Sequence, residues 1–402
     1  MTSIMHADCV KYLKFLLSAL LKILLVSPCL FAATEACAGD DLEVGGYLQV
    51  SALGASVDMP EPIESDHWKE LRLQHRLNLR WHATPELSFH WQMRTRLFAG
   101  KFVRKLPGYA ETLTRDEGLI SLSWTVIDEG DFLLHYIPDR LYVESDRSDW
   151  NVRVGRQRIN WGVNMITNPN DIFNIYSIYD FDYPERPGTD ALRVQRFMGF
   201  GSRIELAASP ARDLKDSVAA ALYSFDLRGY DLQLIGGYYR ERFAGGAGWA
   251  GGLGGAGIKG EAMFFSDLKS KQEARRANFI LAGSVEYMFA NNLFLTGELL
   301  YNRQGGQDRF HPTGAELSPD NPSFSRYQAA VQLAYLIHPL LDGSLTTIYY
   351  PDQKAVFVSP SLIWSAGKNL DLTVLGQLFL AGQDSVFESA GNLVTVALKY
   401  NF

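Results

Sequence analysis

The chain has 402 residues, of which 47% are hydrophobic, and its formal net charge is −7 at pH 7. This mildly acidic balance is not that of a nucleic-acid-binding protein, so we expect no nucleic-acid partner. All three cysteines (Cys9, Cys29 and Cys37) lie near the start of the chain. The rest of the sequence offers no disulfide and no thiolate ligand, and we expect neither a metal nor another cofactor.

The first residues have the order of a secretory signal. Lys11 and Lys14 precede an apolar stretch at residues 15–33, and Ala36-Cys37-Ala38 supplies small residues before Gly39. We therefore predict a signal peptide at residues 1–38 and a mature chain of residues 39–402. A membrane-anchoring helix is the alternative, but the apolar stretch is short and Lys22 interrupts it.

Residues 71–98 contain two runs in which apolar and polar side chains alternate, joined by a turn at Thr84-Pro85-Glu86. Because successive side chains of a strand point to opposite faces, these runs predict a hairpin with one apolar face and one face rich in arginine. Such faces suit lipid on one side and water on the other, as in a transmembrane β-barrel. In this register the facing pairs are Gln74 and Arg96, Arg76 and Arg94, and Arg80 and His90.

Strand-like segments continue to the end of the chain, and after residue 38 no run of about 20 apolar residues is available for a transmembrane helix. We predict an all-β fold, a single-domain transmembrane antiparallel up-and-down β-barrel of about 18 strands, with 16 as the alternative. Residues 118–136 and 243–255 are ambiguous. Short turns such as residues 291–292 alternate with longer polar stretches such as 304–323, which places both chain ends on the periplasmic side.

The last strand, residues 394–402, ends at Phe402. It resembles the terminal strand of bacterial outer-membrane barrels. The resemblance implies that the outer-membrane assembly machinery recognises Phe402.

Three motifs lie in the centre of the chain: GRQRINWG at residues 155–162, NPNDIFN at 168–174 and DALRVQ at 190–195. Over roughly residues 139–199 the chain resembles a poorly characterised group of porin-like outer-membrane barrels of Gram-negative bacteria. The resemblance implies a channel with a passive or substrate-selective role, lipid and small polar solutes as partners, and no catalytic residues. It leaves open the solute and whether the barrels associate as homo-oligomers.

Residues 163–188 are unusual for an exposed connection, because they combine several carboxylates with more apolar and aromatic side chains than water favours. We predict that this segment folds into the barrel as a constriction loop that narrows the lumen. A lid over the barrel mouth is the alternative. The candidate constriction residues are Asp171, Phe173, Asp180, Asp182 and Glu185.

Arginines on the polar face of the hairpin are expected to line the pore. Like charges that face each other across strands are destabilising unless an anion lies between them. We expect loop carboxylates or a permeating anion to fill that position; pairing with neighbouring glutamates such as Glu70 and Glu86 is the alternative. A positive wall opposite an acidic loop would create a transverse field that filters solutes by charge. The candidate pore-lining residues are Arg72, Arg76, Arg80, Arg94, Arg96, Arg156, Arg158 and Arg193.

These features favour an outer-membrane porin-type channel for the passive diffusion of small polar solutes, including anionic ones. A surface receptor or adhesin, or a structural barrel with a closed lumen, is the alternative. We do not expect an enzyme, because no histidine is placed beside a nucleophile and a carboxylate in the predicted strands.

Overall fold

The structure is a computed structural model that describes residues 41–57, 66–116, 118–174, 185–186, 188–199, 201–268, 277–305, 317–382, 385–388 and 391–402. The signal peptide expected at residues 1–38 lies outside the described residues and stays a prediction. No helix in the described ranges is both long and apolar enough to cross a membrane.

Strands dominate the described part of the chain. The first ones are β1 (Leu42–Val57), β2 (Asp66–Thr84), β3 (Leu87–Gly100), β4 (Trp124–Glu129), β5 (Phe132–Arg147), β6 (Trp150–Gln157), β7 (Thr189–Phe197), β8 (Arg203–Ser209), β9 (Val218–Leu227) and β10 (Tyr230–Tyr239). The others are β11 (Arg242–Leu253), β12 (Ala256–Asp267), β13 (Asn278–Met288), β14 (Leu293–Asn302), β15 (Tyr327–His338), β16 (Leu341–Tyr350), β17 (Ala355–Gly367), β18 (Leu370–Ala381) and β19 (Asn392–Asn401). The short helices α2 (Lys101–Lys105) and α3 (Tyr109–Thr114) lie between β3 and β4.

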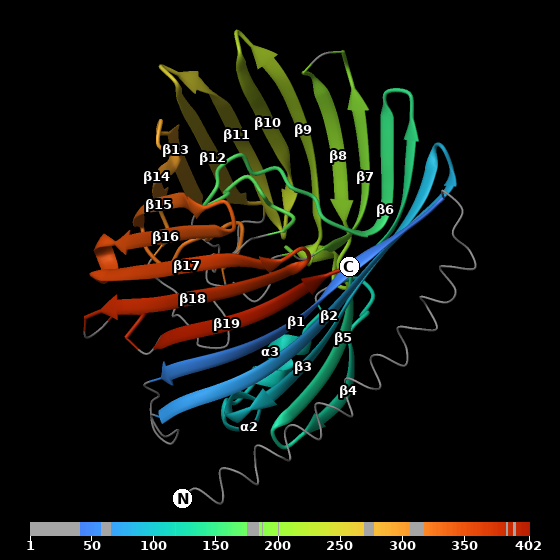
Figure 1. Ribbon diagram of the computed structural model, residues 1–402. Helices are drawn as coiled ribbons and strands as arrows, with labels where there is room; N and C mark the ends of the chain where they lie inside the picture. Colours follow the sequence, from blue (N-terminus) through green and yellow to red (C-terminus); the bar gives the residue numbers. More distant parts are fainter. Residues whose placement is uncertain are drawn as a thin grey trace, which may run out of the picture.

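The strands form one closed antiparallel sheet (Figure 1). Neighbours in the ring are neighbours in the chain, and β1 closes the ring against β19, from the Tyr47–Asn401 pair to the Ser56–Asn392 pair. The exception is β5, which pairs with β3 on one edge while β4 and β6 share its other edge. Because β4 adds no position of its own, 18 of the 19 described strands encircle the barrel. This confirms the predicted all-β, up-and-down barrel of about 18 strands.

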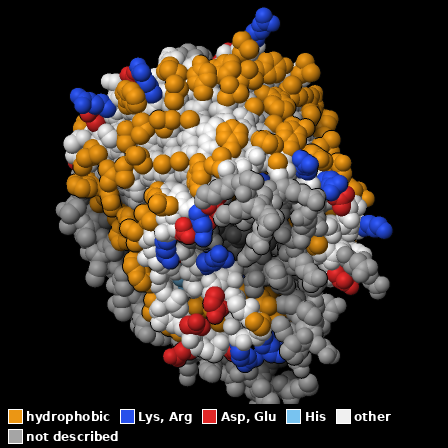
Figure 2. Space-filling model, turned by 180° about the vertical axis from the view of Figure 1, so that it is seen from behind, with side chains coloured by type: hydrophobic (Ala, Val, Ile, Leu, Met, Phe, Trp, Pro, Cys, Tyr) orange, Lys and Arg blue, Asp and Glu red, His pale blue; other side chains and the backbone are white. Residues whose placement is uncertain are grey.

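Apolar side chains cover the outside of the barrel. Leu192 and Leu206 are 47% and 53% exposed, whereas Ala191 and Glu205, one position away in their strands, are 6% and 2% exposed. This is the two-residue alternation of a sheet with two different faces. Figure 2 shows broad areas of hydrophobic side chains on one outer side of the barrel. Charged side chains lie mainly at the margins of these areas.

The connections are short at one end of the barrel and mostly longer at the other. Residues 85–86, 148–149, 228–229, 254–255 and 368–369 make two-residue turns, whereas residues 158–188 and 303–326 are long connections at the opposite end. The β4–β5 and β10–β11 connections, residues 130–131 and 240–241, are short members of the second set. Of the ambiguous segments, 118–136 contains β4 and the start of β5, and 243–255 covers most of β11 and its turn to β12.

The interior is not uniformly polar. Ile159, Trp161 and Ile172, from the connection between β6 and β7, belong to one apolar cluster with buried residues of β9 to β14 such as Leu222 and Phe265. Strand β6 ends at Gln157, and Ile159 and Trp161, which follow it, belong to this cluster. Two more clusters complete the buried part: Ile166 with Phe324, Ala330, Ile348, Tyr350, Ala355, Phe357 and Phe387, and Phe102, Leu106 and Tyr109 with Leu53, Ala55 and Trp68.

Closure of the ring generates the first testable prediction. Gly46 exchanges backbone hydrogen bonds of 3.1 and 3.0 Å with Phe402, and a Cβ atom at residue 46 would lie 2.1 Å from the carbonyl oxygen of Arg76. Gly46→Val should therefore separate β1 from its partners and lower the free energy of unfolding by about 2 kcal/mol or more. Gly54→Val is the matched control, because a Cβ atom there meets nothing within 4 Å. Denaturant unfolding in detergent measures both variants, and equal stability would contradict the prediction.

Candidate functional site

The arginine-rich faces of β2 and β3 meet in the register that the sequence predicts. Gln74 faces Arg96, Arg76 faces Arg94 and Arg80 faces His90. Arg76 and Arg94 are each 3% exposed. Two buried guanidinium groups on facing strands repel each other, so this arrangement requires an anion beside them.

Asp139 of β5 supplies that anion. Its Oδ2 atom lies 2.6 Å from Nη1 of Arg76, and its Oδ1 atom lies 3.4 Å from Nη2 of Arg94. The register shifts at this point, because Gln92 pairs with Arg140 while Met93 pairs with Pro138. Such a bulge redirects side chains, and Asp139 and Arg140 are both buried. The anion thus comes from the adjacent strand, a source that none of the sequence-based interpretations included.

Glu185, a candidate constriction residue, lies beside the same pair. Its Oε2 atom is 3.6 Å from Nη1 of Arg76 and accepts a hydrogen bond of 3.1 Å from the Tyr47 hydroxyl group. The connection between β6 and β7 thus contacts β1 and β2 near its end. Asp180 and Asp182 lie outside the described residues, and their expected role stays a prediction.

Helix α3 and the residues around it cover two of the predicted pore-lining arginines. Nη2 of Arg72 donates to the Tyr109 hydroxyl group over 3.2 Å, and Nη2 of Arg96 donates to the carbonyl oxygen of Leu113 over 2.9 Å. Arg72 also pairs with Glu70, as the alternative interpretation expects. These two arginines therefore make contacts with the segment between β3 and β4.

Arg80 and Arg193 lie apart from the central pair. The half-exposed Arg80 is 3.9 Å from Glu43 near the short-turn end. Arg193 of β7 is buried, lies 3.9 Å from Glu205 and donates to Asn151 over 3.1 Å. Each of them has a carboxylate neighbour on an adjacent strand, so neither is an isolated positive charge.

Arg156, at the end of β6, is held between two carboxylates. It lies 2.8 Å from both Asp116 and Asp190, and its Nη2 atom donates to the carbonyl oxygen of Ile120. Although burial opposes the shift, the hydrogen bond from Arg156 and backbone N–H groups hold the pKa of Asp116 below its usual value. Arg156 therefore links Asp116 and Ile120 to the end of β6 and to Asp190 of β7.

Arg158 and the candidate residue Asp171 belong to a group that includes Arg140 and Arg186. Asp171 is 1% exposed, and its Oδ2 atom lies 4.0 Å from Nη1 of Arg186. Burial raises the pKa of Asp171 to about 8, against the opposing effect of Arg158 and Arg186. Nη2 of Arg140 donates to the carbonyl oxygen of Arg186, which links the group to Asp139. Since Asp171 is largely protonated at pH 7, the arginines carry most of the charge here.

Two buried glutamates hold the backbone of residues 163–170. Glu261 of β12 accepts N–H groups from Val163 (2.6 Å) and Asn164 (2.8 Å) on Oε1 and from Asn170 (2.7 Å) on Oε2. Glu298 of β14 accepts the N–H groups of Ile166 and Thr167 in the same way. An irregular segment cannot satisfy its own N–H groups, so these carboxylates replace the partners that a helix or strand would supply.

Aromatic packing adds to this attachment. The candidate residue Phe173 lies edge-on to Trp161, with 5.0 Å between the ring centroids, and packs against the apolar cluster of β9 to β14. Nε1 of Trp161 donates to Glu205 over 2.9 Å. Phe173 therefore fixes the segment to the wall rather than standing in open solvent.

Sequence reasoning missed Asp139, Glu261 and Glu298. Glu298 is the single carboxylate of β14, and Glu261 lies in the middle of β12, whose other carboxylate, Asp267, is its last residue. A carboxylate on a buried strand face signals a required partner. Asp139 had a weaker signal, because β5 places it beside Arg140 on the buried face, where the bulge interrupts the two-residue period. Across the described ranges, no group of three or more His, Cys, Asp or Glu residues is placed to hold a metal ion.

Comparisons with known proteins support the fold. No protein-family model and no curated protein sequence matches the chain. Among solved structures, it resembles OccAB3 of Acinetobacter baumannii (13% identity, TM-score 0.58, covering 90% of this chain and 100% of that one) and a BenF-like porin of Pseudomonas fluorescens Pf-5 (12%, 0.58, 90% and 99%). OccK11 (OpdR) of Pseudomonas aeruginosa is similar at 13% identity, with a TM-score of 0.57 and coverage of 90% and 96%. The chain therefore has the fold of Gram-negative outer-membrane porins.

The Asp139 cluster leads to a stability prediction. Asp139→Asn removes the anion between Arg76 and Arg94 and should lower the free energy of unfolding by about 3 kcal/mol, because buried like charges are left facing each other. Adding Arg94→Gln to Asp139→Asn should recover part of that loss. Denaturant unfolding of the two single variants and the double variant forms a double-mutant cycle, and strictly additive changes would show that the residues do not interact.

Proposed function

We propose that this chain is an outer-membrane channel through which small polar solutes diffuse passively, with a preference for solutes that carry an acidic group. One observation carries the proposal: within a closed barrel, arginines outnumber carboxylates around Asp139 among the residues that the structure describes. The five arginines are Arg76, Arg94, Arg140, Arg158 and Arg186. Their carboxylate neighbours in the described part of the chain are Asp139, Glu185 and Asp171.

The excess of positive charge explains the proposed preference. Asp139 offsets part of the charge of Arg76 and Arg94, and Asp171 is largely neutral at pH 7 because its pKa is raised to about 8. A net positive region inside a low-dielectric wall attracts anions and repels cations. Ohmic conductance in planar bilayers is expected, because the proposed route is a passive one.

The constriction loop is part of the same proposal. Residues 163–170 hydrogen-bond to β12 and β14, whereas Glu185 contacts β1 and β2. The same connection therefore touches strands far apart in the ring, which supports a segment that crosses the lumen and narrows it. Solutes would then pass between this segment and the arginine-bearing wall of β2, β3 and β5.

The cellular context completes the proposal. The fold favours the outer membrane of a Gram-negative bacterium, reached by cleavage of a signal peptide after Ala38. The terminal residue Phe402 pairs with Gly46 of β1, and recognition by the assembly machinery is proposed for the same aromatic end. Homo-oligomer formation stays open, and no enzymatic activity is proposed.

A structural barrel or adhesin with a closed lumen is the second candidate. It is favoured by the apolar cluster in which Ile166, Phe324 and Phe387 meet, since these residues come from three different connections. Conductance separates the two candidates, because a closed barrel is silent in a planar bilayer.

Charge selectivity tests the arginine wall. Replacing Arg76, Arg94 and Arg96 by glutamine should shift the reversal potential in a salt gradient towards cation preference, because the local excess of positive charge falls while Asp139 and Glu185 remain. Arg147→Gln is the control, since its side chain is 79% exposed near the β5–β6 turn. An unchanged reversal potential in the triple variant would contradict the proposed role of these arginines in charge selectivity. It would not bear on the barrel fold.

Loop attachment gives a separate prediction. In Glu261→Gln one carboxylate oxygen becomes an NH2 group, so at least one of the three backbone N–H groups loses its acceptor, at a cost of about 1–3 kcal/mol. Single-channel conductance should rise or fluctuate between levels as residues 163–170 detach. Glu286→Gln is the matched control, because Glu286 pairs with Lys259. Steady wild-type conductance in Glu261→Gln would argue against a constriction loop held by this carboxylate.

A further inference from the structure

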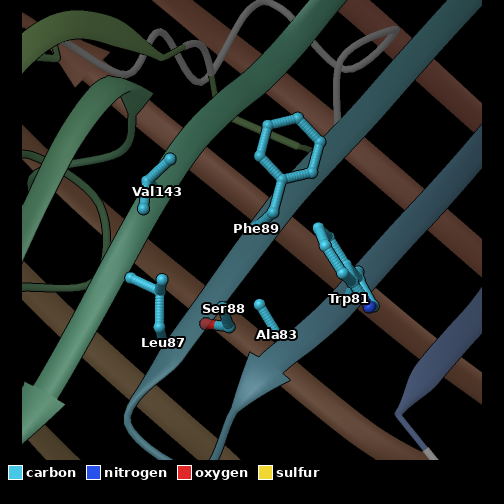
Figure 3. A pocket seen from close by; sticks show the side chains of 6 residues that line it. All are labelled: Trp81, Ala83, Leu87, Ser88, Phe89 and Val143. Atoms are coloured by element: carbon cyan, nitrogen blue, oxygen red, sulfur yellow. The ribbon is translucent and has the colours of Figure 1, made fainter.

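An apolar pocket lies on the outer face of the barrel near the β2–β3 turn (Figure 3). Its volume is about 330 Å³, and every lining side chain except that of Ser88 is apolar. Trp81, Leu87 and Val143 are 51%, 39% and 43% exposed. The lining residues are Trp81 and Ala83 of β2, Leu87, Ser88 and Phe89 of β3, and Val143 of β5.

Strand register places this pocket on the side that faces hydrocarbon. Phe89 lies directly between Trp81 and Val143 across the three strands. The next residues along β3 and β5, His90 and Tyr142, are buried and stack on each other with 4.4 Å between ring centroids. Because side chains alternate, Trp81, Phe89 and Val143 point the opposite way, out of the barrel.

An exposed ion pair lies next to the pocket residue Leu87. Nε of Arg147 is 3.8 Å from Oε2 of Glu86, and the two side chains are 79% and 61% exposed. Glu86 directly precedes Leu87, whose partner in β5 is Ser145, two residues before Arg147. A surface pair at this distance is weak, so each group can bind a third partner at little cost. The next basic residue on this face, Arg196, is already engaged with Trp150 and Asp149.

We propose that this pocket binds a phosphatidylethanolamine molecule, with an acyl chain against Trp81, Phe89 and Val143. Its phosphate group would bind Arg147 and its ammonium group would bind Glu86, so that one zwitterionic headgroup matches the two charges of the pair. Short turns mark the periplasmic end of such barrels, where the leaflet consists of phospholipid. This placement rests on the proposed outer-membrane location and not on the solute that the channel carries.

Native mass spectrometry of the mature protein in detergent tests the site, with phosphatidylethanolamine, phosphatidylglycerol and phosphatidylcholine added at equal concentration. Phosphatidylethanolamine should be retained about tenfold more tightly than the other two lipids. Ala83→Phe fills the pocket and should abolish this retention. Ala262→Phe is the matched control, because Ala262 pairs with the outward-facing Leu281 on the far side of the barrel.

Two charge variants test the headgroup. Arg147→Gln should weaken retention of both phosphatidylethanolamine and phosphatidylglycerol, whereas Glu86→Gln should weaken only the former. Equal retention of all three lipids by the native protein, or undiminished retention by Ala83→Phe, would overturn the proposal. Channel conductance should be unchanged in Ala83→Phe, so a silent channel with normal lipid retention would count against the proposed function alone.

Discussion

Closure of the sheet is the constraint on which the rest of this structure depends. A strand in hydrocarbon has no water to hydrogen-bond to its N–H and C=O groups, so every strand needs a paired neighbour on each edge. The last strand must therefore pair with the first. The pairing of β1 with β19, extended by Gly46 and Phe402, completes that ring. Once it is closed, each strand has one face towards lipid and one towards the interior, and alternation decides which side chains lie on each.

The interior then has to accommodate charge. Buried guanidinium groups and irregular backbone both cost free energy when they have no partners. In this barrel a carboxylate from a strand of the wall supplies the partner in each case. Asp139 sits between Arg76 and Arg94, and Glu261 accepts three backbone N–H groups from residues 163–170. The polar wall and the irregular connection are therefore stabilised by different strands on different parts of the ring.

This division of the interior also shapes the proposed route. Two of the apolar clusters lie along the side formed by β7 to β17, whereas the arginines lie on β2, β3 and β5 and beside the connection after β6. Water and polar solutes favour the charged side. The helical segment around α3 covers Arg72 and Arg96, so the proposed wall is narrower than the row of arginines in the sequence suggests.

The sequence alone determined the barrel, its approximate strand number and the facing of Arg76 and Arg94, because these follow from a two-residue period and a local turn. Only the tertiary structure decided what lies beside those arginines. A one-residue bulge places both Asp139 and its neighbour Arg140 on the buried face, which strict alternation does not allow. Glu261 and Glu298 are 98 and 132 residues away from Val163 and Ile166, their partners in the loop. Such contacts form only when the ring closes and brings these residues together. A local sequence pattern therefore cannot predict contacts between residues so far apart in the chain.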